Sequence, residues 1–160
     1  MAMRMLEVEN LSLSMIHGTS DDGVEACESF IFLNHVNTGI IVPVCWLELA
    51  VLLEDGRYLI LATDENPFEQ TLEIFLVDLQ EGVQERIGLF IIYHDGSLEN
   101  VSVYDSCIEF GYFSTELWRL SVSKKKRYCL PPRGWWAMGL YAFRIYRYLH
   151  MKLVNYDHRS

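Results

Sequence analysis

Basic side chains are scarce over the first three quarters of the chain. Residues 1–121 carry only four, Arg4, Arg57, Arg86 and Arg119, against 21 of the 22 acidic residues, which gives this part a formal net charge of −17. A surface with such an excess of carboxylates repels nucleic acid and attracts a cationic protein, with an association rate that falls as salt rises. We therefore expect a protein partner and no nucleic-acid partner.

Cysteine is also sparse, and its four residues are scattered along the chain: Cys27, Cys45, Cys107 and Cys129. No two of them have the short spacing of a zinc site or a redox motif. Three lie in apolar runs, where a free thiol behaves as a small buried hydrophobic group. We expect reduced core cysteines rather than nucleophiles, with a disulfide as the alternative.

No long apolar run indicates a membrane span. The N-terminus, MAMRMLEVEN, lacks the apolar core of a secretory signal, so we expect a cytoplasmic protein. The most apolar segment, residues 135–154, is interrupted by Arg144, Arg147 and Lys152, each of which a bilayer would disfavour by a few kcal/mol. We expect a buried amphipathic helix there and no membrane partner.

Sequence motifs of catalysis are missing as well. The chain has no phosphate-binding loop, no GxGxxG and no GxSxG. None of the histidines forms a helical i, i+4 pair that would suggest a metal site. They are His17, His35, His94, His150 and His158. We expect no enzyme, no cofactor and no metal ion.

The residues that are abundant indicate one well-packed domain. Hydrophobic residues make up 51% of the chain and aromatic residues 13%, so its 160 residues can bury a large core without a metal or disulfide. Short apolar runs separated by turn signals fill residues 5–122, as in an antiparallel sandwich or half-barrel meander. We expect a mainly β (α+β) fold in a single domain, residues 1–160, whose meander is covered by one C-terminal helix at about residues 135–154.

Two places in this pattern carry local predictions. Asp55-Gly56 lies between two apolar runs and predicts a β-hairpin, with a helix over residues 44–53 as the alternative. The period-two alternation over residues 6–16 changes phase at Asn10, which predicts one strand with a bulge.

The last quarter of the chain has the opposite charge. Residues 122–160 carry nine bases and a single acid, Asp157, for a formal net charge of +8. The densest group of these bases is Lys124-Lys125-Lys126-Arg127. The simplest interpretation is that these cations offset the acidic sheet at the surface of the domain itself.

Two acidic rows are the candidate partner-binding residues. The first combines carboxylates and turn residues with one aromatic side chain, and the second is a similar row of carboxylates. Carboxylates can pair bidentately with arginines of a partner, and an aromatic side chain can act as an apolar anchor. The candidates are Asp64, Glu65, Phe68, Glu69 and Glu73 in the first row and Asp95, Glu99, Asp105 and Glu109 in the second.

The sequence around the first row, ATDENPFEQTLEIFLVD at residues 62–78, resembles segments of small bacterial immunity proteins of polymorphic or contact-dependent growth inhibition toxin systems. The resemblance implies a cytoplasmic protein that neutralises a cognate cationic toxin, such as a nuclease domain, by occluding its active site with an acidic surface. The basic C-terminal part departs from a uniformly acidic immunity surface.

Two other functions fit the sequence. One is a small β-barrel enzyme or ligand carrier, with an aromatic cavity lined by Tyr104, Tyr112 and Trp118. The other is a structural subunit of an assembly, which would expose a broad apolar patch in place of an acidic one.

Overall fold

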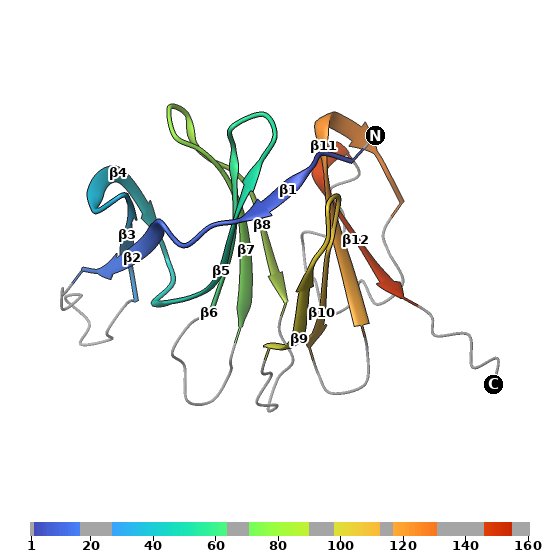
Figure 1. Ribbon diagram of the computed structural model, residues 1–160, viewed down its shortest axis with the longest axis horizontal. Coiled ribbons are helices and arrows are strands. Elements are labelled where there is room, and N and C mark those ends of the chain that lie inside the picture. The colour runs from blue at the N-terminus through green and yellow to red at the C-terminus, as the bar shows by residue number, and fades with distance from the viewer. Residues whose placement is uncertain are drawn as a thin grey trace.

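The computed structural model describes residues 2–16, 27–63, 71–89, 98–112, 117–130 and 146–154, which form twelve strands in three antiparallel sheets (Figure 1). The five-stranded sheet has the order β1 (Met5–Glu7), β5 (Trp46–Leu53), β6 (Tyr58–Thr63), β7 (Leu72–Asp78) and β8 (Gly82–Leu89). The four-stranded sheet has the order β12 (Tyr146–Val154), β11 (Leu117–Tyr128), β10 (Ile108–Tyr112) and β9 (Leu98–Val103). The three-stranded sheet has the order β2 (Leu11–Met15), β3 (Ser29–Leu33) and β4 (Val36–Val42). The predicted mainly β fold is confirmed.

The five-stranded sheet is the central layer of a three-layer sandwich (Figure 1). One of its faces shares a core with the four-stranded sheet, in which Leu61 and Phe110 are fully buried. The other face shares a second core with the three-stranded sheet, which includes Ile60 and Ile31. Side chains of β6 and β7 alternate between these two cores, so both strands are buried along nearly their whole length.

The N-terminal segment hydrogen-bonds to all three sheets (Figure 1). Met3 N donates to Val122 O of β11 at 3.0 Å, β1 then pairs with β5, and β2 pairs with β3. The phase change at Asn10 is a bend where the chain passes from one sheet to another, so the prediction of one bulged strand is wrong. Asn10 O accepts a hydrogen bond from Asn34 N at 2.8 Å, which fixes this crossing.

The β5–β6 hairpin is confirmed. Its turn is closed by Leu53 N donating to Arg57 O at 2.8 Å, and Gly56 has φ +89°, a conformation that favours glycine. Asp55 Oδ1 accepts from Arg57 N at 3.1 Å and its Oδ2 accepts from Arg57 Nε at 2.8 Å. Residues 46–53 are a strand, so the alternative of a helix over residues 44–53 is wrong.

The C-terminal part of the predicted helix is wrong, because residues 146–154 form strand β12 beside β11. Leu149 and Met151 are buried at alternate positions, which is the period of a strand, not of a helix. The Glu85 carboxylate of β8 accepts hydrogen bonds from Tyr148 N at 2.7 Å and Leu149 N at 2.9 Å, which ties β12 to the central sheet. Residues 135–145 of the predicted helix lie outside the described residues.

Among the described residues, no helix has the length and hydropathy needed to cross a membrane.

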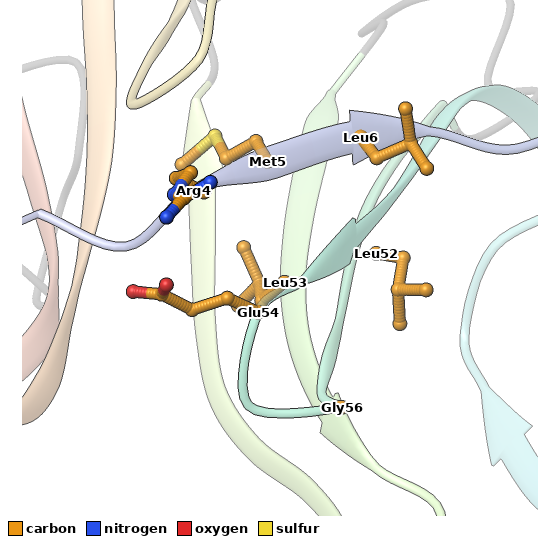
Figure 2. A pocket seen from close by; sticks show the side chains of 7 residues that line it. All are labelled: Arg4, Met5, Leu6, Leu52, Leu53, Glu54 and Gly56. Atoms are coloured by element: carbon orange, nitrogen blue, oxygen red, sulfur yellow. The ribbon is translucent and has the colours of Figure 1, made fainter.

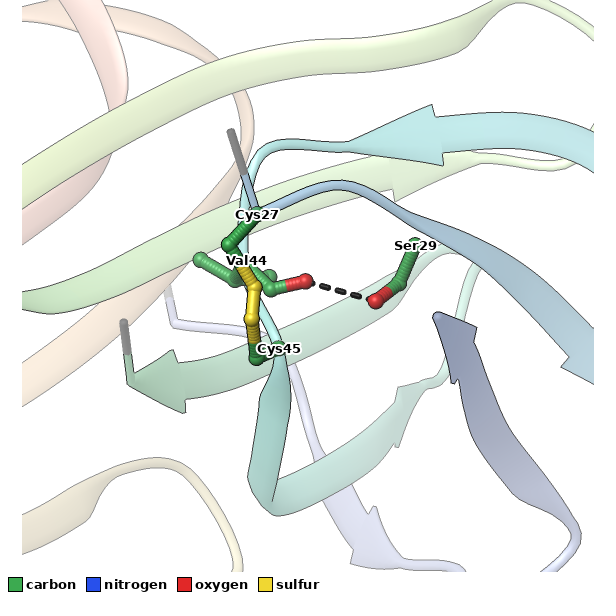
Figure 3. Close-up of a disulfide and its surroundings, with 4 residues drawn as sticks. All are labelled: Cys27, Ser29, Val44 and Cys45. Carbon is green, nitrogen blue, oxygen red and sulfur yellow. Dashed lines mark hydrogen bonds between the residues drawn. A yellow bond between two sulfur atoms is a disulfide. The ribbon is translucent and has the colours of Figure 1, made fainter. Parts of the chain in front are cut away.

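Cys27 and Cys45 form a disulfide, which corrects the expectation of reduced thiols (Figure 3). Their Cα atoms lie 5.7 Å apart, a separation at which disulfides commonly form. Beside them, the buried Ser29 hydroxyl donates to Val44 O at 2.7 Å (Figure 3). Cys107 and Cys129 are free thiols.

We expect the double substitution of Cys27→Ser and Cys45→Ser to lower the free energy of unfolding by about 3 kcal/mol, because the crosslink restricts a short loop of the unfolded chain. The two cysteines are 18 residues apart. Urea denaturation measures the change, and dithiothreitol should destabilise the wild-type chain without affecting the double variant. Cys107→Ser is the control that leaves the disulfide intact. A wild-type urea midpoint that does not change with dithiothreitol would contradict the pairing of Cys27 with Cys45.

Because Tyr112 is buried, we expect the stability of the fold to change with pH in the alkaline range. Its buried phenol oxygen accepts a hydrogen bond from Leu72 N at 3.1 Å, which joins β10 to β7, and burial raises the pKa of Tyr112 to about 12. Because the pKa in the folded chain exceeds that of an exposed tyrosine, about 10, the stabilisation is complete below pH 10 and is lost as pH rises through 12.

We therefore expect Tyr112→Phe to lower the free energy of unfolding by about 1 kcal/mol at pH 8. This difference from the wild type should shrink between pH 10 and pH 12, as measured by urea denaturation at each pH. A difference that stays constant over this range would show that the Tyr112 phenol does not titrate in this way.

Candidate functional site

Most of the first predicted acidic row lies outside the described residues, namely Asp64, Glu65, Phe68 and Glu69, and so does Asp95 of the second row. The strand ends to which their segments attach are described. Thr63 pairs with Leu72 and Leu72 pairs with Leu89 across three adjacent strands. Segments 64–70 and 90–97 therefore leave the central sheet at the same end.

Glu73 is engaged within the chain. Its carboxylate accepts hydrogen bonds from Arg86 Nε and Nη2, each at 2.8 Å, in a bidentate pair between β7 and β8. Gly88 lies opposite Glu73 in the pairing of β8 with β7. The charge of Glu73 is thus largely neutralised by Arg86.

The described residues of the second row are spread over the β9–β10 hairpin. Glu109 pairs with Arg119 on the neighbouring strand β11, and this hydrogen bond raises the pKa of Arg119. Asp105 is exposed in the turn between β9 and β10, whereas Glu99 is exposed near the other end of β9. The three carboxylates are spread along the outer sheet.

The structure instead presents an exposed aromatic and acidic surface at the end of the sandwich where β5 begins and β6 ends. We call this the Trp46 end and define it by Glu28, Trp46, Glu48 and Thr63. The Trp46 side chain is 50% exposed and Glu28 and Glu48 are exposed. Thr63 Oγ1 donates to Glu48 Oε1 at 3.1 Å.

Several covalent and hydrogen-bonded links fix the Trp46 end. Trp46 follows Cys45, and Glu28 follows Cys27, so the disulfide joins the backbones that carry these two side chains. Cys45 N donates to Thr63 O at 3.3 Å. Glu48 is the extra residue of a bulge between Leu47 and Leu49, a device that turns a side chain out of the ladder.

Sequence reasoning missed Trp46, Glu28 and Glu48. Trp46 stands in an apolar run and is indistinguishable there from a core residue. The available signal was the pair Trp46 and Glu48 two positions apart, since a strand shows both on one face. The disulfide that brings Glu28 to the same corner is a long-range contact with no local signal.

The aromatic residues named as a possible cavity lining occupy two different environments. Tyr112 and Trp118 are buried in the core between the central and four-stranded sheets, and Tyr104 is exposed in the β9–β10 turn. A pocket of about 400 Å³ lies elsewhere, between β1 and the β5–β6 turn, and is open to solvent (Figure 2). Its lining is mainly apolar, with Arg4 and Glu54 at one side (Figure 2).

One serine and one histidine meet in the four-stranded sheet. Ser123 Oγ lies 3.0 Å from His150 Nε2, and burial lowers the pKa of His150. The Ser123 hydroxyl is also within 2.7 Å of Lys125 O and 3.2 Å of Tyr148 O. Ser123 is only 2% exposed, so a substrate could not reach this hydroxyl, and the pair is a structural contact of the β11–β12 ladder.

The described residues also offer little support for a reactive thiol or a metal site. Burial raises the pKa of the Cys107 thiol, which lowers its fraction of reactive thiolate. Among the described residues, no three histidine, cysteine or acidic side chains gather in a way that could hold a metal ion.

Comparison of the chain with protein-family models, with curated proteins and with solved structures finds no match.

Proposed function

We propose that this chain is an immunity-type inhibitor that binds a cationic toxin domain, such as a nuclease, and occludes its active site with the Trp46 end. The observation that carries the proposal is the half-exposed Trp46 on a disulfide-linked corner with Glu28 and Glu48. Tryptophan is the side chain most enriched at the energetic centres of protein interfaces, and flanking carboxylates select arginine and lysine partners.

The segments that attach to the chain at this end also contain acidic residues in their sequence. Segment 64–70 attaches at Thr63 and carries Asp64, Glu65 and Glu69, and segment 17–26 attaches at Cys27 and carries Asp21, Asp22 and Glu25. Phe68 of the predicted row belongs to segment 64–70 as a second aromatic candidate. The proposed surface leaves out Glu73 and Glu109, because each pairs with an arginine of the same chain.

Among the described bases, the densest group lies away from the Trp46 end. Residues Lys124–Arg127 lie near the far end of β11, where Arg57 of the β5–β6 turn donates to Lys124 O at 3.4 Å. That turn is at the opposite end of β5 from Trp46. The excess of acid at one end supports electrostatic steering of a cationic partner toward it.

The proposed site of action is the cytoplasm, where a nuclease toxin meets its substrate. Thiols there are kept reduced. In that state Cys27 and Cys45 would be two neighbouring thiols, and the buried hydrogen bond from Ser29 to Val44 would remain to hold β3 against the chain that leads into Trp46. Binding is therefore best measured in both redox states.

The test uses the cationic C-terminal domain of the protein encoded directly upstream of this chain. We expect a stoichiometric complex that inhibits the nuclease activity of that domain and whose association rate falls as salt rises. Trp46→Ala should weaken binding about thirtyfold, and Glu48→Lys should slow association through charge repulsion. Calorimetry, stopped-flow mixing and a nuclease assay measure these effects.

Glu54→Lys is the matched control, because it makes the same charge change at an exposed position in the β5–β6 turn. It should leave affinity within about twofold of the wild type if the Trp46 end is the interface. Absence of binding at low salt, or equal losses from Glu48→Lys and Glu54→Lys, would refute the proposed inhibitor or its proposed surface.

A further inference from the structure

Towards its C-terminal end, β11 departs from regular pairing with β12, and this departure exposes its lysines. Between the pairs Val122–Leu149 and Arg127–Arg147, β11 has four residues, 123–126, and β12 has only Tyr148. The extra residues form a large bulge, which forces the backbone outward. Lys124, Lys125, Lys126 and Arg127 are all exposed.

Internal contacts make this bulge a defined structure. Ser123 Oγ lies 2.7 Å from Lys125 O, which closes the bulge on itself. Arg57 Nη2 donates to Ser123 O at 3.3 Å and Lys124 O at 3.4 Å, and the Arg57 guanidinium lies 4.5 Å from the centre of the Tyr148 ring. The bulge is therefore anchored to the central sheet through the buried Arg57.

Beyond the bulge the two strands continue as an exposed basic and aromatic ribbon, which we call the basic ribbon and define as residues 123–130 and 146–148 (Figure 1). Tyr128 is 77% exposed, Tyr146 50% and Leu130 85%. The rings of Tyr128 and Tyr146 have centroids 4.7 Å apart. Lys126 Nζ lies 6.0 Å from the Tyr146 ring and 5.5 Å from the Tyr148 ring.

We propose that the basic ribbon docks the protein on the surface of an anionic lipid membrane. Four consecutive cations are complementary to acidic headgroups, and each is worth about 1 kcal/mol at such a surface. Tyrosine is favoured at the membrane interface because its ring is apolar and its hydroxyl remains hydrated. This proposal departs from the expectation of no membrane partner, which rested on the lack of a membrane-spanning segment, because the partner here is peripheral to the bilayer.

The exposed Leu130 favours a membrane over nucleic acid as the partner of the basic ribbon. Basic and tyrosine side chains could also contact phosphates and stack on bases. An aliphatic side chain that is 85% exposed gains nothing from a phosphate backbone, whereas it is removed from water at the boundary of the acyl chains. The combination of cations, two neighbouring tyrosines and Leu130 thus favours lipid.

The net charge of −9 is compatible with binding of the basic ribbon to an anionic membrane. The paired strand β12 has nine residues and spans about 26 Å, and β11 runs beside it from the end of the sandwich near Thr63 to its cations at the other end. Salt screens charges over about 8 Å at physiological ionic strength. When the basic ribbon touches the membrane, the Trp46 end therefore points away from it and feels little repulsion.

The test is co-sedimentation of the full chain with vesicles, in the absence of any toxin domain, so it is independent of the proposed function. We expect binding to vesicles of equimolar phosphatidylcholine and phosphatidylglycerol that weakens as sodium chloride is added, and no binding to pure phosphatidylcholine. Lys124→Gln and Lys125→Gln should each weaken binding about fivefold. Leu130→Ser should weaken it roughly tenfold at constant charge.

Lys152→Gln is the matched control, because Lys152 is exposed on β12 beside Arg119, away from the basic ribbon. It should change binding by less than about twofold. Thermal unfolding of each variant checks that the fold is kept. Binding to neutral vesicles, an equal loss from Lys152→Gln, or no loss from Leu130→Ser would overturn the proposal. Tighter binding of a single-stranded oligonucleotide with the same loss from Lys125→Gln would replace lipid by nucleic acid.

Discussion

Both faces of the central sheet are apolar, and the architecture depends on removing both from water. Side chains of β6 and β7 enter two separate cores, so neither outer sheet alone could bury them. The four-stranded sheet covers one face and the three-stranded sheet covers the other. Burial of this apolar area is the main favourable contribution to folding, and loss of either outer layer would expose one face of the central sheet.

The sequence predicted those parts of the fold whose signals are local. Asp55-Gly56 marked the β5–β6 turn correctly, because the backbone conformation of a tight turn depends on the residues in it. The C-terminal strand was misread because Leu149 and Leu153 fit a helical spacing as well as the strand spacing. What decides between them is the pairing with β11 and the hydrogen bonds that Tyr148 N and Leu149 N donate to Glu85, and these partners are far away in the chain.

The candidate site shows the same division between local and long-range information. The excess of acidic residues is a property of composition and needed no structure. Which carboxylates face a partner depends on strand register, and the register places Arg86 against Glu73 and Arg119 against Glu109. The exposure of Trp46 follows from its position at the beginning of β5, which an apolar run in the sequence does not reveal.

The crossing of the N-terminal segment over three sheets has a consequence for the order of events during synthesis. Met3 and Met5 precede their backbone partners, Val122 and Asp105, by 119 and 100 residues, so those partners are synthesised much later. Folds dominated by such distant pairings form slowly. Until then the buried sides of β1 stay open to water and to other chains, where transient exposure of strand edges promotes misassembly. Any sequence fused ahead of Ala2 would lie beside the bridge between Ala2 and Ser123, which joins two such distant parts of the chain.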